Sequence, residues 1–150
     1  MKAPDYFAPF LGWKGLIARP DGLLHSPRGD AWPTREKFAA ECKGGDHTPP
    51  FARCSCGIYA VTSFEALAKN HYNWSEVGTV GDDRWPDGTW VIAEVDLWGG
   101  VRRGMIGYRA QYAYIRTVYV PAHKWKLGRV VRDRYDCGLA FIDRFTGERS

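Results

Sequence analysis

The stretch WVIAEVDLW at residues 90–98 decides the fold class, because its apolar side chains recur at every second position. This two-residue period is that of a β-strand with one buried face. Glu94 and Asp96 fall between the apolar positions and are expected on the opposite, more hydrated face. The side chains that we expect to face the core are those of Val91, Ala93, Val95 and Leu97.

A second alternating run occupies residues 105–120 and follows glycines that permit a turn. Arg109 and Gln111 are expected on one of its faces. The other face is expected to carry Ile106, Tyr108, Ala110, Tyr112 and Tyr114. Because few residues separate the two runs, we expect them to be antiparallel neighbours.

Weaker patterns complete the outline of the chain. In order, they predict a hairpin over 13–25, a helix over 33–41, a strand over 57–61, a helix over 62–71, a loop over 72–88, a basic connector over 122–130 and a strand over 139–142. We therefore expect an α+β fold, built from a bent antiparallel sheet or small β-barrel with one or two short helices and a cysteine/histidine loop at one end.

The composition is that of a globular domain without a membrane span. The chain has 150 residues, of which 45% are hydrophobic, 15% aromatic and 25% charged, and this length fits one domain. We expect residues 1–11 to form an extended lead-in and residues 121–150 a basic C-terminal segment. No run approaches the roughly 18 apolar residues of a transmembrane helix. Pro4, Asp5 and Pro9 interrupt any signal-peptide core, so we expect a cytoplasmic protein without a membrane partner.

Cys42, His47, Cys54 and Cys56 form the one chemically specific cluster, with the spacing Cys-x4-His-x6-Cys-x-Cys. Three thiols and one imidazole suit tetrahedral Zn²⁺. The glycines and prolines around them let the chain wrap an ion, and binding would order a segment that has little signal for regular structure. Because four protein ligands would fill the coordination sphere, such a site would be structural.

The same residues also have a simpler interpretation. Common zinc modules use Cys-x2-Cys pairs, whereas Cys54 and Cys56 are one residue apart and also fit buried thiols at the start of a strand. His47 would then lie on a surface loop. Cys137 is distant in sequence and is expected to be a core thiol. Three isolated histidines could substitute for His47, namely His25, His71 and His123.

An enzymatic function has little support in the sequence. None of the common hydrolase, deaminase or nucleotide-binding motifs occurs. A cysteine–histidine nucleophile pair is conceivable, because such partners need to meet only in space. Two carboxylate pairs, Asp82 with Asp83 and Glu94 with Asp96, leave a hydrolytic site open, although solvated positions in a loop and on a strand explain them equally well.

Positive charge is concentrated between Val101 and Asp136. This segment holds nine basic and two acidic residues, whereas the net charge of the whole chain is +4. Basic side chains interleaved with aromatic rings are typical of surfaces that bind nucleic acid, and an exposed aromatic patch also suits a protein partner. The candidate binding residues are Arg102, Arg103, Lys124, Trp125, Lys126, Arg129, Arg132 and Arg134.

Several short motifs together resemble an uncharacterised protein family found in actinobacteria and their phages. They are GWKG at 12–15, HTPP at 47–50, CSCGIYA at 54–60, VDLWGGV at 95–101 and GYRA at 107–110. The resemblance covers about residues 12–120. It implies a phage or mobile-element origin and supports the domain with its cysteine loop, but it implies no activity.

These observations favour a non-catalytic binding module with a structural zinc site that acts on a host protein or on nucleic acid. Binding of single-stranded or double-stranded nucleic acid through residues 102–134 is one alternative. A small hydrolase that uses a cysteine or a carboxylate is the other.

Overall fold

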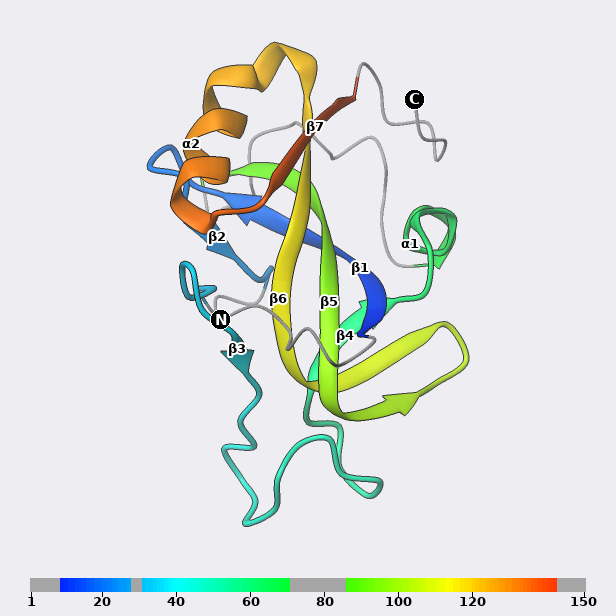
Figure 1. Ribbon diagram of the computed structural model, residues 1–150. Coiled ribbons are helices and arrows are strands. Elements are labelled where there is room, and N and C mark those ends of the chain that lie inside the picture. The colour runs from blue at the N-terminus through cyan, green and yellow to red at the C-terminus, as the bar shows by residue number, and fades with distance from the viewer. Residues whose placement is uncertain (1–8, 28–30, 71–85, 143–150) are drawn as a thin grey trace.

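Two long strands, β5 (Thr89–Arg103) and β6 (Gly107–Pro121), form the centre of the fold. They appear in a computed structural model that describes residues 9–27, 31–70 and 86–142 (Figure 1). The strands are antiparallel, and their pairing runs from Ile92↔Tyr119 to Arg103↔Tyr108 with irregularities after Glu94 and Trp98. The two alternating runs of the sequence are therefore neighbouring strands, as expected.

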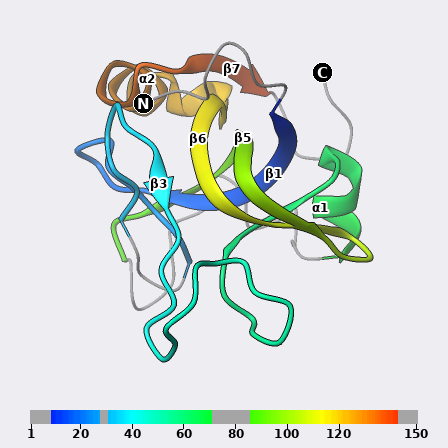
Figure 2. The ribbon, with the colours of Figure 1, turned by 60° about the horizontal axis from the view of Figure 1, so that its bottom comes forward.

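Four strands close a ring of hydrogen-bonded ladders. β1 (Phe10–Ala18) pairs with β5 along its whole length, and β4 (Ile58–Val61) pairs with β6. The ring closes where β1 meets β4, and they share one pair, Trp13↔Val61. Figure 2 shows the strong curvature of β1, β5 and β6 that this closure requires.

Three short strands extend the ring to a seven-stranded sheet. β2 (Leu24–His25) pairs with β1 across the turn at Pro20-Asp21-Gly22, which confirms the predicted hairpin. β3 (Phe38–Ala39) pairs with β6. β7 (Gly138–Ile142) pairs with β6 in the parallel direction, so the sheet is mixed and not wholly antiparallel.

The core lies on both faces of the sheet. The larger cluster includes Leu16, Val95, Leu97 and Ile115, and the smaller one includes Trp13 and Ile92. The predicted inward set of β5, Val91, Ala93, Val95 and Leu97, is fully buried in the larger cluster. An α+β domain of this size thus obtains its stability mainly from apolar burial on two faces.

Two helices pack against different sides of the sheet (Figure 2). α1 (Phe64–Asn70) places Phe64 edge-on against Trp13, with ring centroids 5.3 Å apart. Its first turn is capped by Ser63, whose hydroxyl accepts a hydrogen bond from the backbone N–H of Ala66. α2 (Trp125–Tyr135) follows a short 3-10 turn, η2 (Ala122–Lys124). The Tyr135 hydroxyl donates to the carbonyl of Trp32 at 2.9 Å and holds α2 to the sheet.

The predicted helix over residues 33–41 is wrong. The segment bends and contributes β3 to the edge of β6, and Arg35 has a positive φ of 59°. Phe38 packs edge-on against Trp32, with centroids 4.8 Å apart. Pairing with β6 and burial of this ring outweigh the weak local helix signal, because tertiary contacts override propensity.

The predicted connector over residues 122–130 is also wrong, because α2 occupies much of it. Leu127, Val131 and Tyr135 recur at every fourth residue, and Val131 and Tyr135 are buried. This is the spacing of an amphipathic helix face. The surrounding arginines and lysines obscured the pattern in the sequence.

The single apolar face predicted for residues 106–114 is not kept along β6. Ile106 lies exposed in the turn before the strand, whereas Ala110 and Ala113 both face the larger core cluster. Tyr114 is buried because its hydroxyl donates to the backbone carbonyl of Tyr135, at the end of α2. The pairing of β5 with β6 is irregular, and both faces of the sheet are covered by other elements. The alternation along β6 therefore differs from the prediction.

Several expectations fall partly outside the described residues. Phe10 and Leu11 belong to β1 and not to an extended lead-in, and residues 1–8 are not described. The predicted loop over 72–88 is described only from residue 86. The basic C-terminal segment is described as far as residue 142 and contains η2, α2 and β7.

Candidate metal centre

The cysteine/histidine loop connects β3 to β4 and projects from one end of the ring (Figure 1). Both of its ends are fixed to β6, through Phe38↔Ala113 on one side and Ile58↔Ala110 on the other. Between these anchors, residues 40–57 form turns and bends without helix or strand. The loop therefore starts and finishes on the same rigid strand, which brings its distant residues together.

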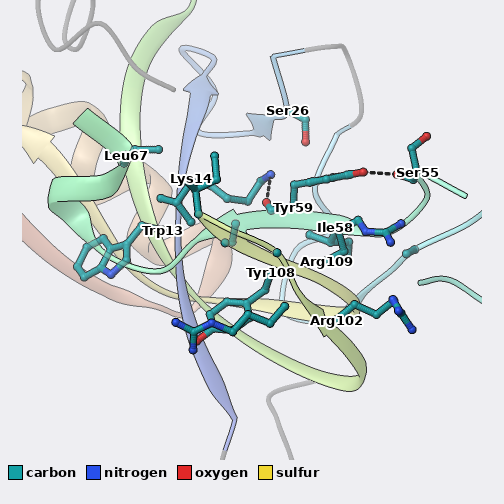
Figure 3. A pocket seen from close by; sticks show the side chains of 18 of the residues that line it. Trp13, Lys14, Ser26, Ser55, Ile58, Tyr59, Leu67, Arg102, Tyr108 and Arg109 are labelled. Atoms are coloured by element: carbon teal, nitrogen blue, oxygen red, sulfur yellow. Dashed lines mark hydrogen bonds between the residues drawn. The ribbon is translucent and has the colours of Figure 1, made fainter. Parts of the chain in front are cut away.

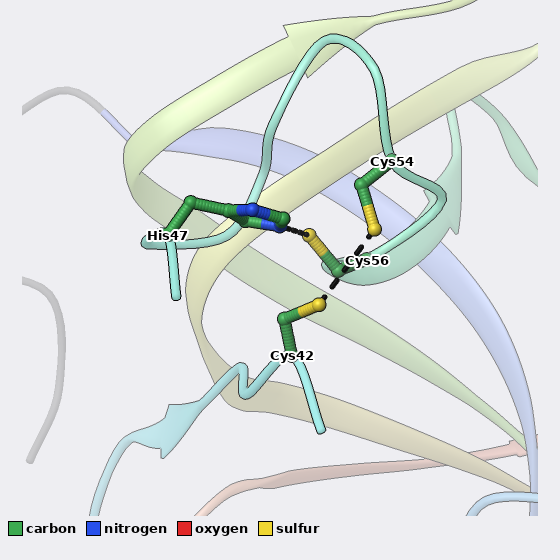
Figure 4. Close-up of side chains that lie close together, drawn as sticks. All are labelled: Cys42, His47, Cys54 and Cys56. Atoms are coloured by element: carbon green, nitrogen blue, oxygen red, sulfur yellow. Dashed lines mark hydrogen bonds between the residues drawn. The ribbon is translucent and has the colours of Figure 1, made fainter. Parts of the chain in front are cut away.

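The four predicted ligands meet in this loop. One donor atom from each of Cys42, His47, Cys54 and Cys56 lies within 4.8 Å of all the others. Figure 4 shows the three thiols and the imidazole ring directed toward one another. Within the described part of the chain, this is the one group of three or more cysteine, histidine or acidic residues that could hold a metal ion.

Two of the distances between the donor atoms are close to those of a tetrahedral zinc site. The Sγ atoms of Cys42 and Cys54 are 3.6 Å apart, and Cys56 Sγ lies 3.4 Å from His47 Nε2. Zn–S bonds of about 2.3 Å and Zn–N bonds of about 2.0–2.1 Å in a tetrahedron place two sulfurs roughly 3.8 Å apart, and a sulfur and a nitrogen roughly 3.6 Å apart. All four cysteines are free thiols. The cluster thus has the donor types and the spacing of a metal site.

Small residues and a ring stack shape the inner surface of the loop. A Cβ atom at Gly45 would lie 2.7 Å from the His47 ring and 3.1 Å from Cys42 Sγ. His47 in turn stacks on Phe51 at a centroid distance of 4.4 Å and an interplanar angle of 17°. Gly57 has a φ of +125°, a conformation that favours glycine, immediately before β4. The stack on Phe51 and the close approach of Gly45 thus fix the imidazole beside the thiols.

Arg109 on β6 fastens the loop to the sheet. Its guanidinium donates hydrogen bonds to the backbone carbonyls of Cys54, Cys56 and Phe51, the last two at 3.0 and 3.4 Å. A charged donor that serves three carbonyls fixes the backbone on which two of the ligands stand. The sequence placed Arg109 on a hydrated face and gave no sign of this positioning role.

The thiols differ in their electrostatic surroundings. A hydrogen bond from the backbone N–H of Cys56, assisted by the Cys42 and His47 side chains, lowers the pKa of Cys54 to about 7. The same pair of thiols raises the pKa of Cys42, because its proton is held in the hydrogen bond with Cys54. Burial raises the pKa of Cys137 to about 11. A thiolate is the form that binds a metal, so the cluster favours ligation and Cys137 does not.

Among the described residues, the other histidines and the pair Glu94 and Asp96 form no comparable site. His25 is buried in β2, within the β1–β2 hairpin, and His123 is exposed in η2, whereas His71 is outside the described residues. Asp96 on β5 lies 3.4 Å from Arg116 in an ion pair. The pair Asp82 and Asp83 also falls outside the residues that the structure describes.

The basic candidate residues lie in two separate places. Arg102 and Arg103 are exposed at the end of β5, beside the turn to β6, and α2 lies at the opposite end of the molecule in both views (Figures 1 and 2). The others belong to η2 and α2 and are Lys124, Trp125, Lys126, Arg129, Arg132 and Arg134. The segment therefore does not form one basic face, and a role in binding stays a prediction.

The fold and the cluster define an α+β protein with a Cys₃His group that could hold a metal ion. Searches of protein-family models, curated proteins and solved structures found no match. The resemblance carried by the CSCGIYA and VDLWGGV motifs accordingly stays a prediction. Among the helices of the described segments, none has the length and apolar character needed to cross a membrane.

Proposed function

We propose that the protein is a non-catalytic binding module whose cysteine/histidine cluster binds one structural Zn²⁺ ion. The convergence of four donor atoms within 4.8 Å of one another carries the proposal. Three thiolates and one imidazole occupy all four positions of a tetrahedral zinc ion, so no position remains for a reacting water. The ion would hold the loop between β3 and β4 in one conformation.

An ordered loop of this kind can serve recognition. Residues 42–56 are mostly exposed and carry no regular secondary structure, so a bound ion would supply the order that their backbone lacks. If the chain is encoded by a phage or mobile element, its partner would be a host protein or nucleic acid. The zinc site would then be the scaffold of the binding surface and not the surface itself.

Metal analysis of protein purified without added metal tests the zinc proposal. Elemental mass spectrometry should find one zinc per chain. Cys54→Ser should lose it, whereas the control Cys137→Ser should keep it, because Cys137 lies outside the cluster. Replacement by Co²⁺ should give the visible absorption of a tetrahedral thiolate site in the wild type and in Cys137→Ser.

A metal-free protein that also fails to take up Zn²⁺ or Co²⁺ would overturn the proposal, as would full zinc content in Cys54→Ser. The separation of 3.4 Å between Cys56 Sγ and His47 Nε2 would then favour a nucleophile pair. In that case His47→Ala should slow the labelling of Cys56 by iodoacetamide, read by peptide mass spectrometry, and this result would direct attention to covalent chemistry.

The surface of α2 favours nucleic acid as the partner. Trp125 is 44% exposed, and both the Lys126 ammonium and the Arg129 guanidinium lie over its ring, at 5.5 and 5.0 Å from the centroid. Exposed cations beside an aromatic ring combine phosphate attraction with base stacking. Arg132 and Arg134 are less available because they pair with Asp133 and Asp21.

Binding of fluorescein-labelled oligothymidylate at low and high salt tests this second candidate. The double variant Lys126→Ala/Arg129→Ala should bind more weakly and reduce the salt slope by about 1–2. Arg102→Ala/Arg103→Ala is the matched control at the other end of the molecule and should leave binding unchanged. No binding at low salt would contradict a nucleic-acid partner and leave a host protein.

A further inference from the structure

An open groove lies where β1 and β4 separate. The two strands share the single pair Trp13↔Val61, and beyond it the space between them forms a groove of about 1070 Å³ (Figure 3). Its walls come from both strands, from the turn after β2 and from the end of the β5–β6 hairpin. Its volume is at the upper end of the range that small-molecule sites occupy.

Lys14 places a charge inside this groove. It stands on β1 between Gly12 and Leu16, which face the larger core cluster, and strand alternation directs Lys14 to the same side. Its ammonium donates one hydrogen bond, to the backbone carbonyl of Tyr59. Among the described residues, no carboxylate forms an ion pair with it. Two of its three donors thus remain for a ligand.

Partial burial weakens the hydration of this ammonium. Lys14 is half-buried in the groove, and desolvation lowers its pKa to about 8. A partly desolvated cation without a counter-charge attracts an anion that can pair with it. The geometry of the groove, open to solvent on one side, allows such an anion to enter.

A second donor and aromatic walls accompany Lys14. Ser26 Oγ accepts a hydrogen bond from Trp32 Nε1 at 2.9 Å, so its own proton stays available to donate. In Figure 3 the ends of the Lys14 and Ser26 side chains both point into the groove. Phe38 and the exposed Tyr59 supply aromatic surface on the wall, and Phe38 is supported edge-on by the buried Trp32.

The charge of the lining has the same sign throughout most of the groove. Arg102 and Arg103 stand at its outer end, and Glu41 is the one carboxylate among the lining residues. Arg109 also lines the groove but is occupied by the loop carbonyls. The field within the groove therefore favours a negatively charged ligand.

We propose that this groove binds a small organic anion, with a carboxylate or phosphate group held by Lys14 and Ser26 and an aromatic or apolar body against Phe38 and Tyr59. None of the four candidate metal ligands lines the groove, although Ser55 and Gly57 of the same loop do. The proposal does not depend on which partner α2 binds. The groove gives the protein a ligand-binding function in addition to the proposed structural metal site.

Ligand-observed NMR on the metal-loaded protein tests the proposal with benzoate, phenyl phosphate and the neutral benzyl alcohol as probes. At least one anion should bind, and benzyl alcohol should bind at least about tenfold more weakly, because it lacks the charge-assisted hydrogen bond. The tighter of the two anions identifies the head group. Lys14→Met should lose anion binding, whereas the control Lys37→Met, which changes a lysine that lies over the Tyr112 ring and does not line the groove, should keep it.

A second measurement avoids any dependence on the folding of the Lys14 variant. Wild-type lysines can be acetylated with acetic anhydride and read by peptide mass spectrometry. Lys14 should be protected by the binding anion, and Lys37, which does not line the groove, should be unaffected by it. The proposal would be overturned if benzyl alcohol bound as tightly as the anions, or if Lys14→Met kept full anion binding. It would also be overturned if neither saturating benzoate nor saturating phenyl phosphate changed the acetylation rate of Lys14.

Discussion

At the scale of the residue, Gly45 and Gly44 are neighbours with opposite surroundings. A Cβ on Gly45 would press against the His47 ring and the Cys42 thiol, whereas a Cβ on Gly44 would meet no atom within 4 Å. Neither residue has a positive φ, so the two positions differ in space and not in backbone strain. They form a matched pair for testing the packing of the cluster.

Gly45→Ala should weaken metal binding, and Gly44→Ala should not. The added methyl group must displace the imidazole or the thiol, which spoils tetrahedral geometry at a cost of about 1–3 kcal/mol, or roughly tenfold to a hundredfold in the metal dissociation constant. Competition with a chromophoric zinc chelator measures this. Equal affinities in the two variants would show that the glycine does not shape the site.

The reactivity of the thiols should follow their surroundings. In metal-free protein, iodoacetamide at neutral pH should label Cys54 before Cys137, because the pKa of Cys54 is lowered to about 7 and that of Cys137 is raised to about 11. Peptide mass spectrometry reads the order. Added Zn²⁺ should protect Cys54 and leave the slow labelling of Cys137 unchanged; equal rates without metal would contradict the assignment.

At the scale of the element, Arg109 joins the cysteine/histidine loop to β6. Its guanidinium bonds three loop carbonyls, while its backbone belongs to the ladder between β4 and β6. Arg116, further along the same strand, is exposed and pairs with Asp96 at 3.4 Å. One arginine therefore supports a loop and the other supports a surface ion pair.

Arg109→Met should loosen the loop without unfolding the ring. Loss of the charge-assisted bonds should cost about 1.5–3 kcal/mol in loop stability, whereas Arg116→Met should cost about 0–1 kcal/mol, as exposed ion pairs do. Hydrogen exchange should show faster exchange over residues 42–56 in Arg109→Met alone. Unchanged exchange there would mean that the loop is held by the cluster itself.

The β5–β6 turn offers a second matched pair of glycines. A Cβ at Gly107 would collide with the backbone carbonyl of Ala60 on β4, whereas the nearest atom to a Cβ at Gly104 is 3.7 Å away. Gly107→Ala should therefore separate β4 from β6 and destabilise the protein by about 1–3 kcal/mol. Gly104→Ala should have little effect. Urea unfolding of both variants measures the difference, and equal midpoints would contradict this close approach.

At the scale of the whole molecule, buried titratable groups make the free energy of unfolding depend on pH in the alkaline range. Burial raises the pKa of Cys137 from 9.0 to about 11 and that of Tyr135 from 10.0 to about 12. The unfolded chain then releases these protons first, so the stability that each group contributes is lost as pH rises through this range. Lys14 acts in the opposite direction between pH 8 and 10.5, because its pKa is lowered on folding.

A variant isolates one of these contributions. The measured quantity is the free energy of unfolding of the wild type minus that of Cys137→Ala. This difference should fall by about 1–3 kcal/mol between pH 8 and pH 11, since one pKa unit corresponds to about 1.4 kcal/mol. Urea midpoints at the two pH values measure it. Cys54→Ala, in metal-free protein, is the control and should show no such fall. A constant difference for Cys137→Ala would mean that its thiol is open to solvent when folded.

The sequence alone determined the α+β class, the central pair of strands, the β1–β2 hairpin and the identity of the cysteine/histidine cluster. Each of these follows from local information: a period of two along residues 90–98, a turn at Pro20-Asp21-Gly22, and donor residues close together in the chain. Side chains within about 15 positions of one another can meet by local folding of a flexible loop.

Tertiary structure alone decided the closure of the ring, the parallel docking of β7 and the strand at 38–39 in place of a helix. It also brought Arg109 to the cluster and left Lys14 inside a groove. These features depend on contacts between residues distant in sequence, such as Arg109 with Cys56 and Lys14 with Tyr59. No local pattern encodes them, because the energy that selects them is the burial and hydrogen bonding gained when separate elements pack together.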